Sequence, residues 1–192
     1  PVQMTGAGDL NTTQYGSSRF YLPQGEITMT VSLGQAAITE TLALAAGDLI
    51  ERDVIIGSGL AVVDGYYVDG MIMDTSQHSV EVLAAKKALD GSQERLTASY
   101  GAGAKFDLPP GDYIARITQD SATADTPFTV KAGERVEVKV VLNAGVLNVT
   151  AAGATSIEVF GAKLDLNGNR TSRVFDYSEV LNKTLPEGDY VA

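Results

Sequence analysis

Much of the chain alternates apolar with polar residues, which is the period of a β-strand that buries one face. In Ile27–Leu33 the apolar side chains fall on odd positions, and threonine or serine occupies the even ones. Val136–Leu142 follows a similar pattern, with glutamate and lysine between valines. A period of two turns successive side chains inward and outward. We therefore predict antiparallel strands with one buried and one solvated face.

A phrase of the form Leu-Pro-x-Gly recurs three times along the chain. The copies begin at Leu22, Leu108 and Leu185, so that they lie 86 and 77 residues apart. Other matches keep these separations. Ala46-Gly47-Asp48 falls on Ala132-Gly133-Glu134 at the first, and Ser79–Val82 falls on Ser156–Val159 at the second. Self-similarity at a fixed period predicts an array of similar units, here of roughly eighty residues each.

The repeat predicts three parts, which we call copies 1, 2 and 3. Copy 1 (residues 1–58) is the second half of a unit, preceded by an irregular N-terminal stretch. Copy 2 (59–144) is a complete unit, and copy 3 (145–192) is the first half of another. Because the two halves are complementary, we predict that copy 3 completes a second sandwich with residues 21–58, within one chain or by strand exchange in a homodimer. The out-of-phase ends also predict a segment of a longer protein.

One segment, Val82–Leu89, has good helical propensity. Its counterpart in copy 3, Val159–Leu166, alternates and contains a glycine. We therefore predict strands in both places, ending in turns at Asp90-Gly91 and Asn167-Gly168. Each complete unit then has about seven short strands, which are most simply buried as two packed sheets. The predicted fold is all-β, a tandem of immunoglobulin-like β-sandwiches.

The repeated motifs resemble a known group of domains. A Leu-Pro-x-Gly-Asp-Tyr strand opening, a following Phe-x-Val-x-Ala-Gly-Glu and a valine-rich last strand are similar to the prealbumin-like sandwiches of bacteria, the carboxypeptidase regulatory-like and Cna-B-like group. The resemblance covers nearly everything after Arg19. It implies non-enzymatic modules of surface and secreted proteins, and hence an extracytoplasmic location that is periplasmic, cell-surface or secreted.

Composition removes several classes of function. The 192 residues include 14 Lys and Arg against 24 Asp and Glu, giving a net charge of −10, with no Cys and one His. Without Cys there is no thiol chemistry, and a single imidazole cannot build a multi-histidine metal site. The acidic balance disfavours nucleic acid as a partner. No apolar run approaches the roughly eighteen residues of a membrane span, so we expect neither membrane insertion nor a cofactor.

An insertion over residues 64–78 distinguishes copy 2 from copy 3. It carries the candidate ligand-binding residues, whose types suit contact with a protein or glycan at a cell surface. These residues are Tyr66, Tyr67, Met71 and Met73. The alternative is a hairpin extension whose side chains pack on their own unit. The sequence leaves both interpretations open.

Other candidate chemistry is weaker. We expect His78 to be a solvent-facing loop residue, and no arrangement of residues predicts a catalytic group. The run Asp165–Asn169 is expected to be a turn rather than a calcium loop, because its glycine is misplaced and the bidentate Glu is lacking. The resemblance implies that a Lys–Asn isopeptide bond deserves a test at Lys86 and Asn143, but the candidate assisting carboxylate, Glu137, is predicted to face outward.

The sequence therefore predicts a non-enzymatic structural or interaction module. We expect a tandem β-sandwich spacer or display segment of a bacterial cell-surface or secreted protein, used in architecture or adhesion. The alternative is a glycan- or protein-binding module that acts through the 64–78 insertion.

Overall fold

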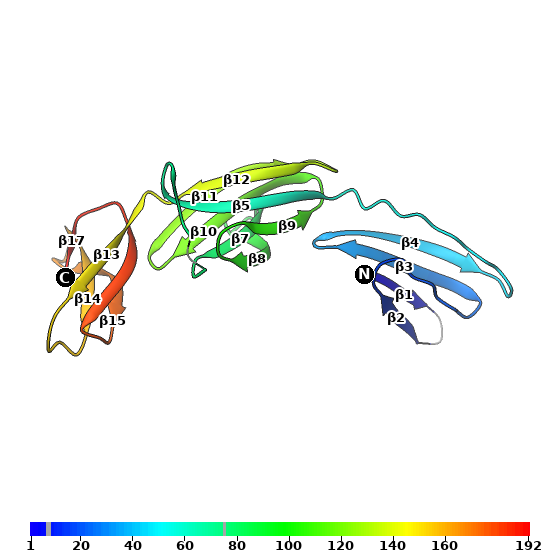
Figure 1. Cartoon of the computed structure of the whole chain (residues 1–192), viewed down its shortest axis with the longest axis horizontal. Coiled ribbons are helices and arrows are strands. Elements are labelled where there is room, and N and C mark those ends of the chain that lie inside the picture. Colours follow the sequence, from blue (N-terminus) through cyan, green and yellow to red (C-terminus); the bar gives the residue numbers. More distant parts are fainter. Residues whose placement is uncertain (7–8, 75) are drawn as a thin grey trace. The chain divides into compact units, whose positions relative to one another are not determined.

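The computed structural model describes residues 1–6, 9–74 and 76–192. It is all-β, and none of these residues forms a helix (Figure 1). The described part of the chain accordingly offers no helix that could cross a bilayer. Contacts divide the chain into two compact units. Unit 1 comprises Pro1–Ala61, Phe106–Gly111 and Thr129–Val136, and unit 2 comprises Val62–Lys105, Asp112–Phe128 and Glu137–Ala192.

Copy 1 forms one antiparallel four-stranded sheet in the order β2-β1-β3-β4 (Figure 1). Its strands are β1 (Val2–Gly6), β2 (Leu10–Gln14), β3 (Gly25–Leu33) and β4 (Ala36–Leu44). The sheet buries Met4, Ile27 and Met29 on one face, against the partly buried Phe20, Leu22 and Val54 from irregular segments. The N-terminal stretch, expected to be irregular, therefore contains two strands.

Copy 2 contains two sheets with the orders β11-β10-β7-β8 and β12-β5-β6, and β9 adds to the second sheet by pairing with β5. The strands are β5 (Gly59–Val68), β6 (Met71–Ile72), β7 (Ser79–Lys87), β8 (Gln93–Tyr100), β9 (Ala104–Leu108), β10 (Gly111–Gln119), β11 (Ala122–Val130) and β12 (Arg135–Val141). Val63, Val82, Ile117 and Val140 are fully buried. A Cβ added at Gly65 on β5 would lie 3.0 Å from Ile117 Cδ1 on β10, so the two sheets face one another across a core.

Copy 3 also has two sheets, a β13–β16 pair and a three-stranded sheet in the order β15-β14-β17. The strands are β13 (Ala144–Thr150), β14 (Ile157–Leu164), β15 (Arg170–Asp176), β16 (Val180–Pro186) and β17 (Tyr190–Val191). Ile157 and Val159 of one sheet pack with Leu181 and Leu185 of the other in a buried cluster.

The hairpins of copies 2 and 3 have the same strand register at a separation of 77 residues, including the places where the register shifts. In β7 and β14 these irregularities follow Val82 and Val159, respectively. The equivalent cross-strand pairs are Val80–Ser99 and Ile157–Asp176, Glu81–Ala98 and Glu158–Phe175, Leu83–Arg95 and Phe160–Ser172, and Lys87–Gln93 and Leu164–Arg170. The segment with helical propensity is thus the end of a strand, as the repeat predicted.

Copies 1 and 2 show the same correspondence at a separation of 86 residues. Strands β3 and β4 begin and end 86 residues before β10 and β11. Both connecting turns place a residue in the left-handed region at the same position, with φ of 56° at Gly34 and 50° at Asp120. The N-terminal hairpin also has a counterpart. Met4 on β1 faces Met29 on β3, as Val82 on β7 faces Ala115 on β10, so β1 and β2 occupy the places of β7 and β8.

The first and last strands of copy 2 run parallel to each other. The Leu60 amide donates to the Glu134 carbonyl (2.9 Å), and the Leu142 amide donates to the Tyr66 carbonyl (2.9 Å). Residue numbers therefore rise together along β5 and β12. The strand order β12-β5 consequently brings the two ends of a copy into one hydrogen-bonded pair.

Candidate functional site

The first part of the 64–78 insertion is a hairpin, formed by the end of β5 and by β6. Tyr66 faces Ile72, and Val68 faces Met71. Gly70, with φ of 85°, makes the turn between them. This geometry favours glycine because a Cβ is strained at positive φ. Thr75, which belongs to the insertion, lies outside the described residues.

The four candidate binding residues do not share one surface. Met73 is fully buried, and its amide donates to the Gly65 carbonyl (2.8 Å). A Cβ at Gly65 would lie 3.0 Å from Met73 Sδ, so the sulfur fills the space above that glycine. Met73 is therefore a core residue, whereas Met71 is 58% exposed. Tyr66 and Tyr67 are half-buried.

A charged pair fixes the outer side of the hairpin. Lys139 Nζ on β12 lies 4.4 Å from the centre of the Tyr66 ring and forms an ion pair with Asp69 in the hairpin turn. The hydrogen bond from Lys139, and next its charge, lower the pKa of the Asp69 carboxyl from its ordinary value. Tyr66 is thus held against its own unit, as the packing interpretation requires.

What remains available for contact is the tip of the hairpin. Val68, Met71 and Ile72 are 46%, 58% and 48% exposed. Apolar side chains gathered on an exposed hairpin are suited to contacting a protein surface. Of the four candidates, this tip contains only Met71, and the exposed Val68 and Ile72 were not anticipated. Their positions after the second tyrosine and beside Met71 are the signal that was present in the sequence.

His78 is buried, so the expectation of a solvent-facing histidine is wrong. Its carbonyl accepts a hydrogen bond from the Gly101 amide (3.0 Å). Burial lowers the pKa of the imidazole, while a hydrogen bond with the Gly101 backbone and the charge of Asp64 oppose that shift. The side chain sits where β7 begins, in the interior rather than in a loop.

The acidic residues considered as calcium ligands have structural roles. Asp64 accepts a hydrogen bond from the Gly103 amide (2.7 Å) and so anchors the loop before β9. Asp165 accepts the amides of Asn167 and Asn169 (both 2.8 Å). The bond from the Asn169 amide is the main cause that lowers the pKa of Asp165. Within the described ranges, no cluster of three acidic or histidine side chains is placed to hold a metal ion.

The isopeptide candidates also lie at the surface. Lys86, Asn143 and Glu137 are all exposed, and Glu137 faces outward as its place in the alternation predicted. Asn143 has φ of 48°, the left-handed conformation of a turn residue. An isopeptide bond of the kind considered needs a carboxylate kept from water, and these positions do not supply one.

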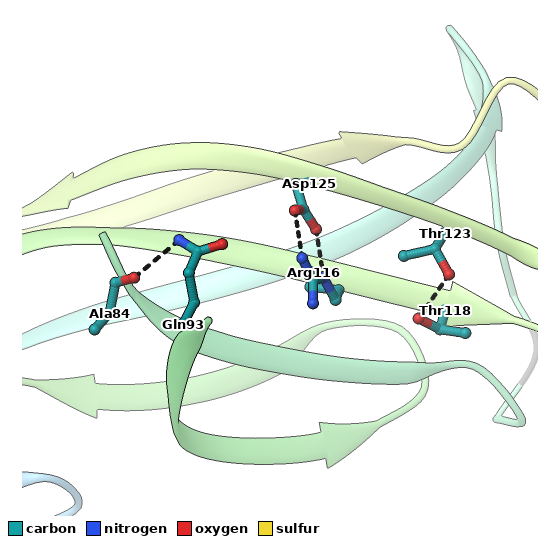
Figure 2. Close-up of polar contacts among 6 residues, drawn as sticks. All are labelled: Ala84, Gln93, Arg116, Thr118, Thr123 and Asp125. Carbon is teal, nitrogen blue, oxygen red and sulfur yellow. Dashed lines mark hydrogen bonds and ion pairs between the residues drawn. The ribbon is translucent and has the colours of Figure 1, made fainter. Parts of the chain in front are cut away.

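The outer face of sheet β11-β10-β7-β8 carries a set of polar contacts (Figure 2). Arg116 grips Asp125 through two hydrogen bonds of 2.7 Å. Thr118 and Thr123 hydroxyls lie 3.1 Å apart, and Gln93 Nε2 donates to the Ala84 carbonyl (3.1 Å). These residues tie neighbouring strands together on a solvated face, which is a structural rather than a chemical use of charge.

A surface that the sequence did not predict lies on the buried face of the copy 1 sheet. It is a groove of about 1180 Å³, enclosed between the sheet and the irregular segments 18–24 and 45–53. The residues at its base are apolar. They are Val2, Met4, Ile27, Met29, Leu42 and Leu44.

Comparisons with known proteins give little beyond this description. No protein-family model and no curated protein matches the chain. Among solved structures, the Bacillus anthracis TIE protein is similar with a TM-score of 0.33 and 15% identity, over 98% of this chain and 40% of that one. A streptococcal ancillary pilin has a TM-score of 0.38 and 14% identity, over 97% of this chain and 69% of that one. The chain spans less than half of the TIE protein chain. Both scores are low, so neither likeness assigns a function.

Proposed function

We propose that this chain is a spacer or display segment of a bacterial cell-surface or secreted protein. It is a non-enzymatic module of tandem immunoglobulin-like sandwiches of the prealbumin-like, Cna-B-like kind. Copy 2 is the complete unit, with about seven principal strands. Copies 1 and 3 are parts of neighbouring units. Its location is extracytoplasmic, at the cell surface, in the periplasm or outside the cell.

The observation that carries this proposal is the shared register. Hairpins 77 residues apart agree in every cross-strand pair, including the two irregularities. Side-chain identities differ at most of these positions, so the common property is the backbone path. A chain that repeats a backbone path while its surface residues change sets distances and presents surfaces.

The pairing of β5 with β12 supports a role under tension. Because these strands are parallel and lie at opposite ends of copy 2 in the sequence, a pull on the two ends of the copy slides one along the other. All the hydrogen bonds between them then bear load together. A segment built in this way is suited to hold its length when a surface structure is stretched.

Single-molecule stretching of the whole chain tests the proposal, since forced unfolding reports the unfolding barrier. Handles are attached at Pro1 and Ala192. We expect one dominant unfolding event from copy 2, residues 59–144, with a contour length of roughly 280–310 Å at 3.3–3.6 Å per residue. Leu60→Pro removes a donor from the β5–β12 ladder and is expected to lower the unfolding force.

Leu60→Ala is the matched control, because it shortens the same side chain and keeps the amide. We expect it to retain most of the unfolding force. A wild-type chain that extends without a resistive event, or a proline variant as strong as the alanine variant, contradicts the proposed role under tension.

A second candidate function is recognition of a protein or glycan by the 64–78 insertion, with Tyr66, Tyr67 and Met71 in contact with the ligand. The exposed tip of the hairpin favours it. Met71→Ser and Ile72→Ser together are expected to abolish binding on protein and glycan arrays while the melting temperature is retained. Arrays that show no ligand for the wild-type chain count against recognition and leave the spacer role in place.

The proposed exchange of strands between copies 1 and 3 in a homodimer stays a prediction. Sedimentation velocity over a wide concentration range tests it. A chain that remains monomeric throughout contradicts the intermolecular form.

A further inference from the structure

The groove on copy 1 has a filled counterpart in copy 2. In copy 2, β5 pairs with β12 on one side and with β9 on the other. At a separation of 86 residues, β9 corresponds to 18–22 and β12 to 49–55. These two segments enclose the groove. Both are irregular, although β9 and β12 are strands.

The difference has a simple cause. In the part of copy 1 that the structure describes, no strand corresponds to β5. The segments 18–22 and 49–55 therefore have no central strand to form a ladder with. Their backbone amides and carbonyls would pair with such a strand, as those of Leu60 and Glu134 do in copy 2. Their alternating burial at Ile50, Val54 and Ile56 keeps the pattern of a strand.

The base of the groove also matches the surface that β5 covers. Met29 and Val31 on β3 correspond to Ala115 and Ile117 on β10. In copy 2, Gly65 of β5 packs on Ile117, with a prospective Cβ 3.0 Å from its Cδ1. The larger Met29 and Met4, in place of Ala115 and Val82, leave less depth above the sheet. A strand with small residues on its inner face, like Ala61, Val63 and Gly65, therefore fits best.

We propose that this groove binds one extended strand of another polypeptide, of the β5 type. The donor has small or apolar side chains at alternate positions and runs parallel to segment 49–55, with its other edge along 18–22. The groove volume of about 1180 Å³ exceeds the roughly 300–1,000 Å³ of small-molecule pockets. Its apolar base and two strand-like walls suit strand addition, in which backbone hydrogen bonds give affinity and alternate side chains give specificity.

This inference goes beyond the proposed spacer role and does not depend on it. It makes copy 1 a strand acceptor, a means of joining this chain to a further polypeptide. Copy 1 would gain a second sheet on binding and reach the arrangement that copy 2 has within itself.

The test uses the whole chain and a fluorescein-labelled peptide with the sequence of residues 58–66. We expect saturable binding of one peptide per chain by fluorescence anisotropy, and a rise in melting temperature with peptide concentration. Hydrogen exchange is expected to slow at 49–55 and 18–22, with little change in copy 3. Protection along 49–55 locates the peptide independently of any variant.

Two peptide variants provide the matched control. Val63→Glu puts a charge on the face that enters the groove and is expected to abolish binding. Val62→Glu puts the same charge on the opposite face, and we expect it to bind within a few-fold of the parent. Absence of binding by the parent peptide, equal binding by V63E, or protection confined to other segments overturns the proposal. So does a stable dimer of the chain that protects 49–55 and excludes the peptide, because the occupant is then a second copy.

Discussion

Arg116 and Asp125 lie opposite one another on β10 and β11, and two hydrogen bonds of 2.7 Å join the guanidinium to both carboxylate oxygens (Figure 2). The positions 86 residues earlier are Thr30 and Thr39, which are cross-strand partners on β3 and β4. Their hydroxyl oxygens are 3.2 Å apart. The repeat thus keeps a polar contact at this point of the sheet while it changes the chemistry of the contact.

This replacement predicts a modest coupling between Arg116 and Asp125. Both side chains are about one-third exposed, 35% and 38%, so solvent screening limits the ion pair, and we expect a coupling energy of about 0.5–1 kcal/mol. A double-mutant cycle with Arg116→Ala and Asp125→Ala, followed by urea denaturation, measures it. The hydrogen bond from Arg116 also lowers the pKa of Asp125, so R116A is expected to raise that pKa.

The threonine pair supplies the control for this cycle. R116T together with D125T reproduces the contact of copy 1, and we expect the double variant to be more stable than the double-alanine variant. A coupling energy of zero at low salt would show that the two close hydrogen bonds contribute nothing to stability.

Gly59 and Gly145 provide a matched pair of substitutions. They occupy the same place in the repeat, before β5 and in β13. A Cβ at Gly59 would meet the Lys131 carbonyl oxygen and lie 2.6 Å from Val130 Cγ1, whereas a Cβ at Gly145 meets nothing within 4 Å. We expect G59A to cost about 1–3 kcal/mol through overpacking against backbone. G145A is expected to be close to neutral. Chemical denaturation of the two variants checks this, and equal losses contradict the comparison.

The repeat allowed much of the fold to be predicted from the sequence. The Leu-Pro-x-Gly phrases open β3 and β10 and precede β17, and the alternation of Ile27–Leu33 marks β3. The comparison of Val82–Leu89 with its counterpart overrode helical propensity because a glycine and β-type alternation in one copy constrain the other. Backbone registers recur in the array, so one clear copy identifies an ambiguous one.

What could not be predicted depends on partners distant in sequence. The N-terminal hairpin β1–β2 has short, polar strands, and only pairing with β3 makes them strands. Segment 49–55 has the alternation of a strand but lacks a partner in the described structure. His78 and Met73 share the insertion with exposed residues, and nothing local distinguishes them. Their burial follows from packing against β5 and the loop at Gly101, which the sequence does not specify.

The Lys139–Asp69 pair yields a prediction about the hairpin. Lys139→Met keeps most of the side-chain stem and removes the charge that contacts Asp69 and the Tyr66 ring. We expect the pKa of Asp69 to rise toward its ordinary value, because the hydrogen bond and charge of Lys139 lower it. An NMR titration of the Asp69 carboxyl measures the change. Lys139→Arg should keep the lowered pKa, and an Asp69 pKa that does not respond to K139M shows that the pair is absent in solution.

His78 gives the chain a pH-dependent stability. Burial lowers its pKa in the folded state, whereas the unfolded imidazole titrates near its ordinary value of about 6.5. Below about pH 6.5 the unfolded chain therefore binds a proton that the folded chain does not. Stability supplied by the neutral imidazole is full above that pH and is lost as pH falls toward the lower folded pKa.

The experiment is urea denaturation of the wild-type chain and of His78→Gln between pH 7.5 and 5. We expect wild-type stability to fall more steeply than that of the variant, by at most about 1.4 kcal/mol per pH unit for one proton. H78Q shares every carboxylate with the wild type, including Asp64 nearby, so the difference between the two slopes isolates the imidazole. Parallel slopes would mean that His78 is protonated equally in both states and that its burial is relieved in solution.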